Sequence, residues 1–428
     1  MFTFDKLGLP VLGLRGLEAD LSEEERAIQE NVHRFARDVM RPIGKKLDAM
    51  TPEEVVAEGS PLHDYMAQMY ASGILDLGAL DSMSDLEKSR IFPLIFEELG
   101  WGDSGLAIAT LASAIPAFTA YGTGDPEIIE RFGSLPGCWL ATQPDKGSEI
   151  VDMDATNVHP GTQQLKGNLS VRKDGNEYVI NGQSSAWVSY GPLAQTAMAY
   201  LPCDYGDGLF KEGTQGLNWV GIMIPLDSPG VSRGKPLDKI GQRALPQGGL
   251  FFDDVRIPEK YAIATGDKAV GQMMGTLTFA NMEMAATFTG VARAAFEHAL
   301  DYVHERKQGG TAIINHQSVQ TRIFSLWQKV EASRALSKHV FSYNYASHGP
   351  HVLASVTSKT FVTDTAFQVT SDALQLFGGN GLTKEYPMEK IMRDARAAMI
   401  EDGENTVLGL KGVTWLTRWY QDKHNISV

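Results

Sequence analysis

Cysteine is almost absent from this chain of 428 residues. The two that occur, Cys138 and Cys203, are too few for a disulfide framework or a cysteine-ligated metal site. The ten histidines form no HExxH motif or other ligand spacing. We therefore predict no metal. So few cysteines fit a reducing compartment, and we expect a cytoplasmic protein.

Long apolar runs and a surplus of positive charge are also missing. No apolar run approaches the 18 residues that a membrane helix needs, and the first residues, MFTFDKLGLPVLGLRG, do not resemble an export signal. The formal net charge of −14 argues against a nucleic-acid or anionic-membrane surface. We therefore expect neither nucleic acid nor a membrane as a partner. With 43% apolar residues, the chain can instead fill the cores of two or three globular domains.

Changes in the spacing of apolar residues divide the chain into three parts. A helical pattern begins after Ser22, which forms a predicted capping box with Glu25, and further helical segments follow. The next part is rich in turn residues, and it has β-prone runs at 169–172, 178–181, 220–224 and 250–257. Long helical segments then return at about 271–307, 315–347, 358–377 and 388–400. We predict a multidomain α and β fold with an N-terminal helical domain (1–137), a middle β domain (138–263) and a C-terminal helical bundle (264–428).

One segment near the C-terminus stands out, residues 377–403, which read FGGNGLTKEYPMEKIMRDARAAMIEDG. Local chemistry predicts a helix, a tight turn and a second helix. Its glycines suit either a positive φ or a close approach of the backbone to a ligand. The segment lacks the Lys-Ser/Thr pair of a phosphate-binding P-loop and follows a helix, so it is not a nucleotide fingerprint.

This segment resembles the C-terminal signature of the acyl-CoA dehydrogenases, in which GGNG is followed by EYP, EK and RDA. Four further segments are similar to motifs of that family: TQPDKGSE (142–149), NGQSSAWVS (181–189), IGQRALPQGGLFFDDVRIP (240–258) and NHQSVQ (315–320). Members have an N-terminal helical domain, a middle β domain and a C-terminal four-helix bundle, which is the order predicted above. The resemblance covers most of the chain, and it implies that this protein is an oxidoreductase and a flavoprotein.

The resemblance implies a bound FAD. Thr142 and Ser189 would hydrogen-bond the isoalloxazine edge, and Trp187 would lie against the flavin. The segment before Trp187 is one residue longer than usual, so we expect a bulge there. Family positions that hold the FAD pyrophosphate and adenosine fall on Arg306, Gln317, Gln375, Gly378 and Gly379. In the family a neighbouring subunit supplies the glutamine and glycines, which implies a homo-oligomer, at least a dimer and commonly a homotetramer.

The implied reaction is the α,β-dehydrogenation of an acyl thioester, acyl-CoA or carrier-bound, as in fatty acid metabolism. A carboxylate removes the α-proton, the β-hydrogen leaves as a hydride to flavin N5, and the electrons pass to an electron-transfer flavoprotein. The commonest base of the family is the glutamate of a YEGT segment. That segment falls on residues 401–404, where the sequence is EDGE. The resemblance therefore places Asp402 at the base position.

An aspartate at this position is unusual. Its side chain is about 1.5 Å shorter than that of glutamate, whereas a base must come within roughly 3 Å of the proton that it removes. Glu401 stands in place of the usual tyrosine and Glu404 in place of the threonine. Either glutamate could raise the pKa of Asp402, serve as the base itself, or be a solvated residue at a helix end. The sequence leaves these alternatives open.

The residues on the substrate side depart from the family pattern as well. Thr278 and Asn281 stand where members often carry an aspartate and an arginine that helps to position the thioester tail. Ser148 matches a position that touches the pantetheine arm. We predict that Ser148, Arg243 and Glu401 contact the substrate.

Two other functions remain open. A flavin oxidase of the same fold, similar to nitroalkane oxidase, would use Asp402 as its base and O₂ as the electron acceptor. A degenerate paralogue would have lost catalysis and would serve as a binding subunit. The complete C-terminal signature favours the dehydrogenase, and the retained Thr142, Trp187 and Arg306 favour a bound flavin.

Overall fold

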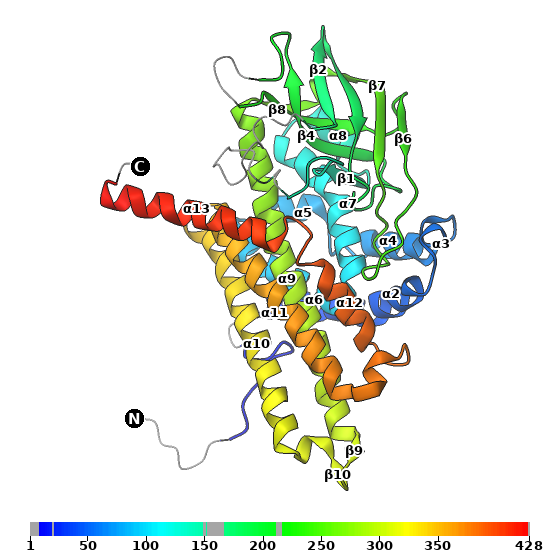
Figure 1. Ribbon diagram of the computed structural model, residues 1–428, viewed down its shortest axis with the longest axis vertical. Coiled ribbons are helices and arrows are strands. Elements are labelled where there is room, and N and C mark those ends of the chain that lie inside the picture. Colours follow the sequence, from blue (N-terminus) through cyan, green and yellow to red (C-terminus); the bar gives the residue numbers. More distant parts are fainter. Residues whose placement is uncertain (1–7, 19–20, 149–150, 152–166, 211–215, 427–428) are drawn as a thin grey trace.

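The computed structural model describes residues 8–18, 21–148, 151, 167–210 and 216–426, and it consists of N-terminal helices, a β-sheet and long C-terminal helices (Figure 1). This order confirms the predicted fold class. The last N-terminal helix ends at Phe132, the strands run from Gly137 to Thr265, and helices resume at Asp267. The exact domain boundaries stay predictions.

The N-terminal part packs short amphipathic helices around two buried ones. Ser22 caps the first helix and forms the predicted capping box with Glu25. A turn of π-helix, Ala36–Met40, follows it directly. The helices are α1 (Glu23–Phe35), α2 (Arg41–Asp48), α3 (Pro52–Val56), α4 (Pro61–Ala71), α5 (Leu77–Ser82), α6 (Asp85–Gly102), α7 (Ser104–Thr123) and α8 (Pro126–Phe132).

Among the described residues, α7 alone is long and apolar enough to suit a membrane span. Of its apolar window 61% is buried inside the protein, as is usual for the core helix of a globular domain.

The middle part is a twisted, mostly antiparallel sheet. Its strands are β1 (Gly137–Leu140), β2 (Ser170–Asp174), β3 (Glu177–Gln183), β4 (Thr196–Asp204), β5 (Trp219–Pro225), β6 (Val231–Arg233), β7 (Leu250–Pro258) and β8 (Ala262–Thr265). They are ordered β6-β7-β3-β2-β4-β5-β8, and β1 pairs in parallel with β4. Strands β2 and β3 form a hairpin, in whose turn Gly175 adopts a positive φ of 58°.

The C-terminal part is a helical bundle built around α9 (Asp267–Glu305), which runs from β8 to the far end of the molecule (Figure 1). At 1.5 Å per residue its 39 residues extend about 58 Å. A small hairpin of β9 (Lys307–Gln308) and β10 (Thr311–Ala312) follows it. The remaining helices are α10 (Gln317–Phe341), α11 (Val352–Phe377), α12 (Met388–Ala397) and α13 (Asn405–His424). Helices α9, α10 and α11 pack on one another, and α13 crosses α11 (Figure 1).

Candidate active site

The loop between α12 and α13, residues 398–404, contains the three carboxylates that the sequence singles out. Its backbone turns sharply, because Asp402 and Gly403 both adopt positive φ values, 50° and 98°. A non-glycine residue in this region is strained, and such residues are common at functional sites. The turn directs the side chains of neighbouring residues to different surroundings.

Glu404 caps helix α13. Its Oε2 accepts hydrogen bonds from the N–H groups of Thr406 and Val407, at 2.9 and 3.1 Å. Partial burial works to raise the pKa of Glu404, but these N–H groups outweigh it and lower the pKa. A carboxylate that is already satisfied at a helix N-terminus is a poor general base. The structure therefore assigns Glu404 a capping role.

Asp402 has no such partner for its carboxylate among the described residues. Burial raises its pKa above the usual value, although the charge of Lys359 opposes this effect. A raised pKa makes the carboxylate a stronger base for a C–H proton. Of the three acids, Asp402 therefore suits the role of base best.

Two helices hold the Asp402 loop in place. From α9, Asn281 Nδ2 donates to the backbone carbonyl oxygen of Asp402, at 3.1 Å. From α11, Lys359 Nζ donates to the carbonyl oxygen of Gly403 at 2.7 Å and to Asn405 Oδ1 at 2.8 Å. Burial lowers the pKa of Lys359 to about 8, although the nearby carboxylates, Asp402 first among them, work to raise it. The loop geometry thus depends on side chains that the sequence motifs do not include.

Glu401 points toward the sheet and not toward the solvent. Gln242 Nε2 donates to its Oε2 at 2.8 Å. Burial raises the pKa of Glu401 to about 7, while Gln242 and the charge of Lys239 oppose the increase. Gln242 is itself 1% exposed and adopts a positive φ of 49°, and its Oε1 has no hydrogen-bond partner within the described structure. Glu401 is therefore a partly buried, hydrogen-bonded acid next to Asp402 and not a fully solvated residue.

A fourth acid, Glu283 on α9, escapes the sequence motifs altogether. It is 5% exposed, and Thr287 Oγ1 donates to its Oε1 at 2.9 Å. The charges that act on it are those of Asp402 and Glu401. Sequence alone gives no signal for this residue except an acid inside a long apolar helix.

The predicted flavin-edge residues form a connected group in the β domain. Thr142 Oγ1 lies 2.6 Å from Ser185 Oγ, which in turn accepts a hydrogen bond from the Trp187 N–H at 3.2 Å. Ser189 Oγ accepts from Gln247 Nε2 at 3.1 Å. The pairing of β3 with β7 shifts register between residues 180 and 182, and the bulge expected between Gly182 and Trp187 stays a prediction.

The surface of this group suits a flat aromatic ligand. Trp187 is 60% exposed, which is unusual for so large an apolar side chain unless another group covers it. Hydroxyl groups of Thr142 and Ser185 lie beside it and can donate or accept hydrogen bonds. The residues present therefore fit the isoalloxazine ring of a flavin.

The other predicted cofactor residues gather at the opposite end of the bundle. Arg306 directly follows α9, and Gln317 begins α10. Gln375 lies in the last turn of α11, and Gly378 and Gly379 follow that helix; all five residues are exposed. An added Cβ would meet no atom within 4 Å at Gly378 or Gly379. The backbone at this end is thus open to close approach by a ligand, and the arginine can form bidentate hydrogen bonds with a pyrophosphate.

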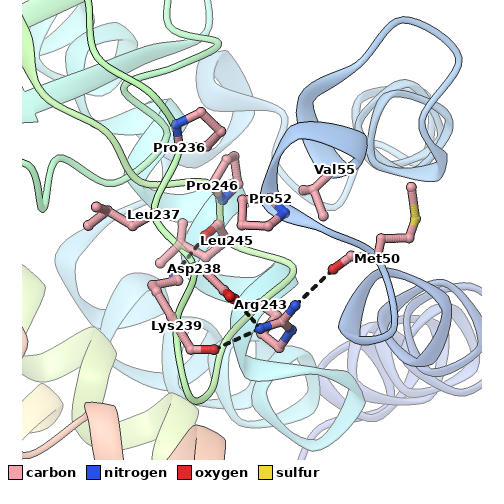
Figure 2. A pocket seen from close by; sticks show the side chains of 10 residues that line it. All are labelled: Met50, Pro52, Val55, Pro236, Leu237, Asp238, Lys239, Arg243, Leu245 and Pro246. Atoms are coloured by element: carbon pink, nitrogen blue, oxygen red, sulfur yellow. Dashed lines mark hydrogen bonds and ion pairs between the residues drawn. The ribbon is translucent and has the colours of Figure 1, made fainter.

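The two remaining substrate predictions have different surroundings. Ser148 Oγ accepts a hydrogen bond from the Glu404 N–H at 3.0 Å, so it lies against the Asp402 loop. Arg243 lies in a small pocket between the β domain and the helices around Met50 (Figure 2). Its guanidinium donates to the carbonyl oxygens of Met50 and Lys239, both at 2.9 Å, and to Asp238 at 2.5 Å.

These bonds, with one to the carbonyl of Asp48 at 3.0 Å, use both the Nε and the two Nη atoms of Arg243. The guanidinium thus joins the N-terminal helices to the 238–247 loop, and its predicted contact with the substrate stays a prediction.

The chain is similar to several known proteins. Residues 270–411 match the family described as acyl-CoA dehydrogenase, C-terminal domain. The chain is 27% identical over 401 residues to cyclohex-1-ene-1-carbonyl-CoA dehydrogenase of Syntrophus aciditrophicus, a match that covers 91% of this chain and 88% of the relative. It is also 27% identical over 398 residues to cyclohexane-1-carbonyl-CoA dehydrogenase of Geobacter metallireducens, covering 90% and 95%.

Solved structures give the same picture of the fold. A glutaryl-CoA dehydrogenase from Mycobacterium smegmatis in complex with FADH2 superposes with a TM-score of 0.77 at 21% identity. The superposition covers 93% of this chain and 95% of that one. The shared architecture therefore extends through all three parts of the chain.

Proposed function

We propose that this chain is an acyl-CoA dehydrogenase-like flavoprotein that binds FAD and desaturates an acyl thioester between Cα and Cβ. The observation that carries the proposal is the partly buried carboxylate of Asp402, which has a raised pKa and lies on a loop fixed from two sides by Asn281 and Lys359.

Each residue of the candidate site would have its own role in this reaction. Asp402 takes the α-proton, and its burial favours that transfer because a partly desolvated carboxylate is a stronger base. Asn281 and Lys359 hold the loop so that the carboxylate meets the α-carbon. Thr142, Ser189 and Trp187 orient the flavin ring, which when bound supplies the acceptor for the β-hydride.

We propose an acyl group that carries its carbonyl on a ring carbon. Both relatives named above act on six-membered-ring thioesters, according to their names. A shorter base supports the same conclusion, since aspartate leaves about 1.5 Å more room at the α-carbon than glutamate would. A ring substituent at that carbon needs such space.

We further propose that the enzyme is a homo-oligomer with flavin sites shared between subunits. Thr142 and Trp187 lie in the β domain, and the Asp402 loop contacts α9 at Asn281, whereas Arg306 follows the last residue of that helix. Arg306 lies 25 residues beyond Asn281, about 38 Å along the helix axis, which is more than one FAD can bridge. A second copy can bring its Arg306 end to the first copy's Trp187.

The test is anaerobic reduction of the purified yellow protein. A panel of cyclohexanecarbonyl-CoA, cyclohexenecarbonyl-CoA, butyryl-CoA, an acyl-carrier thioester and a nitroalkane would be titrated while the visible flavin absorbance is followed. We expect bleaching by thioesters, fastest with a ring-bearing acyl group, and reoxidation by an electron-transfer flavoprotein much faster than by O₂.

Other outcomes have defined meanings. Bleaching by the nitroalkane alone, with rapid reoxidation by O₂, would replace the dehydrogenase with an oxidase of the same fold. A protein purified gently without flavin, and unable to take it up, would contradict the proposal as a whole.

A further inference from the structure

Gln247 is a buried amide to which the reaction above assigns no role. It lies within the motif segment 240–258 and is 4% exposed. The backbone places it opposite Ser189, because the two residues pair as an isolated antiparallel β-bridge. A neighbouring hydrogen bond from the Tyr190 N–H to the Pro246 carbonyl oxygen, at 2.8 Å, fixes this register. Residues paired in this way project their side chains to the same side, so the Gln247 amide reaches the Ser189 hydroxyl.

Lys239 determines which way the Gln247 amide is turned. Its Nζ donates to Gln247 Oε1 at 2.8 Å and to the Leu245 carbonyl oxygen at 2.7 Å. An ammonium group can only donate hydrogen bonds, so the amide atom that faces it must be the oxygen. The amide nitrogen is therefore turned the other way, toward Ser189 and the backbone of Trp187.

The amide nitrogen of Gln247 in turn fixes the role of the Ser189 hydroxyl. Gln247 Nε2 donates to Ser189 Oγ at 3.1 Å and to the Trp187 carbonyl oxygen at 3.4 Å. An amide nitrogen cannot accept a hydrogen bond, so Ser189 accepts here and its own O–H points elsewhere. Within the described part of the chain no acceptor takes that O–H. Ser189 is only partly buried, so the O–H is available to a ligand that covers Trp187.

The neighbouring hydroxyl groups of the site are not fixed in this way. Thr142 Oγ1 and Ser185 Oγ lie 2.6 Å apart, and either of them can be the donor. The Trp187 N–H donates to Ser185 Oγ, but that oxygen can still donate its own hydrogen or accept a second one. Of these three hydroxyl groups, that of Ser189 is the one whose partners leave it a single role, as a donor to a ligand.

We propose that Lys239 and Gln247 are positioning residues for the flavin, because through them the Ser189 O–H is held as a donor to an acceptor atom of the isoalloxazine ring. This inference rests on the proposed function, in which Ser189 meets a bound FAD. A donor held at that edge favours the electron-rich, reduced ring over the oxidised one, since hydrogen bonds to a charged acceptor are roughly twice as strong as neutral ones.

The variant that tests this arrangement most directly is Gln247→Glu. It keeps the length of the side chain and the hydrogen bond from Lys239. Its second oxygen accepts where the amide nitrogen donated, so the Ser189 O–H turns toward it and away from the ring. A merely structural role predicts no loss from this change, because a carboxylate beside a lysine is well paired. Lys239 is a poorer target, since its charge also acts on Glu401.

The readouts are the affinity for FAD and the reduction potential of the bound flavin, and neither needs a substrate. The full-length protein, freed of flavin, would be titrated with FAD, and the midpoint potential of the holoenzyme would be measured by equilibration with a redox dye. We expect Gln247→Glu and Ser189→Ala each to weaken the binding of oxidised FAD about 3–10-fold and that of reduced FAD roughly 10–100-fold. The midpoint potential should therefore fall in both variants.

A double-mutant cycle separates the lost hydrogen bond from the added charge of Gln247→Glu. Ser189→Ala should have no further effect in the Gln247→Glu background, because the hydroxyl there no longer serves the ring. An uncharged cycle with Gln247→Met gives a second test if Gln247→Glu does not fold. Gln247→Met leaves the hydroxyl free to rotate, so its loss should be smaller and should vanish in the Ser189→Ala background. The matched control is Gln195→Glu, the same change at an exposed position before β4, which should keep the wild-type values.

The possible outcomes separate this proposal from the proposed function. Additive effects of Ser189→Ala and the Gln247 variants, or wild-type values in Gln247→Glu, would overturn it. If no thioester bleaches the wild-type flavin while the cycle shows the expected coupling, the dehydrogenation fails and the role of Gln247 stands. If thioesters bleach the wild type but the cycle shows no coupling, dehydrogenation stands and the role of Gln247 is refuted. A protein unable to take up FAD would contradict both.

Discussion

Asp402, Glu401 and Glu404 are neighbours in sequence, yet each has a different chemical state because each meets a different partner. Glu404 meets helix N–H groups, Glu401 meets the Gln242 amide, and the Asp402 carboxylate meets none of these. The differences follow from the positive φ values at Asp402 and Gly403, which separate the three side chains. At this scale the surroundings of each acid, and not its residue type, decide which of the three suits the role of a base.

The raised pKa of Glu401 predicts a pH-dependent contribution to stability. Its folded-state pKa of about 7 lies above the usual 4.5, so the folded state binds the proton more tightly. The resulting stabilisation is complete below pH 4.5 and is lost as the pH rises through 7. Urea unfolding of wild type and Glu401→Gln should show that the wild type loses up to about 3 kcal/mol relative to the variant over this interval. A difference that is constant with pH would contradict a partly buried, protonated Glu401.

Glu404 offers a test at the level of one helix end. Replacing it with alanine removes the cap of α13 and should lower the free energy of unfolding by about 1 kcal/mol, while the flavin is still bleached by substrate at a similar rate. Glu404→Asp, which can still cap, is the matched control. Loss of bleaching in a stable Glu404→Ala protein would return this residue to the list of candidate bases.

The loop between α12 and α13 depends on helix α11 through one side chain. Lys359→Met keeps the length and apolar stem but removes the hydrogen bonds to Gly403 and Asn405, at 2.7 and 2.8 Å. We expect a loss of about 1–3 kcal/mol in unfolding free energy and slower bleaching at saturating substrate, because the base is no longer held. Lys359→Arg should recover part of both. Unchanged bleaching in Lys359→Met would show that the loop does not need this anchor.

Elements with strong local signals could be predicted from the sequence, and those without them could not. The β7 strand and the end of α11 at Phe377 match the predicted β-prone run and helix within one residue. Helix α13 was not predicted. Its apolar residues are exposed along much of its length, so the sequence does not need the apolar stripe by which a packed helix is recognised. The predicted helix at 388–400 ends earlier, at Ala397, where the loop between α12 and α13 begins.

In the candidate site, too, some residues could be predicted from local sequence and others could not. A motif places Asp402, Thr142 and Trp187 because local sequence fixes them. Glu283 and Lys359 join the site only through packing between distant segments, which no local pattern records. Gln242 lies within a motif segment, but no local pattern predicts its contact with Glu401. Predicting them requires the tertiary structure.

At the scale of the whole molecule, the separation of the two flavin-binding groups predicts complementation between subunits. Asp402→Asn and Arg306→Ala should each be inactive alone, the first for lack of a base and the second for weak FAD binding. Co-expressed, they should form mixed oligomers in which one site combines an intact Asp402 with an intact Arg306 of the other subunit. Activity restored in the mixed oligomer supports a shared site, and none would be restored if each chain held its own flavin.

The central claim is that the Asp402 carboxylate removes the α-proton of a thioester. The most direct measurement is stopped-flow bleaching of the bound flavin by cyclohexanecarbonyl-CoA under anaerobic conditions, for wild type and Asp402→Asn loaded with equal FAD. We predict rapid bleaching of the wild type and a rate lower by roughly 10²–10⁴-fold in Asp402→Asn, the usual contribution of a general base. Equal bleaching rates in the two proteins would contradict the assignment and place the base elsewhere in the site.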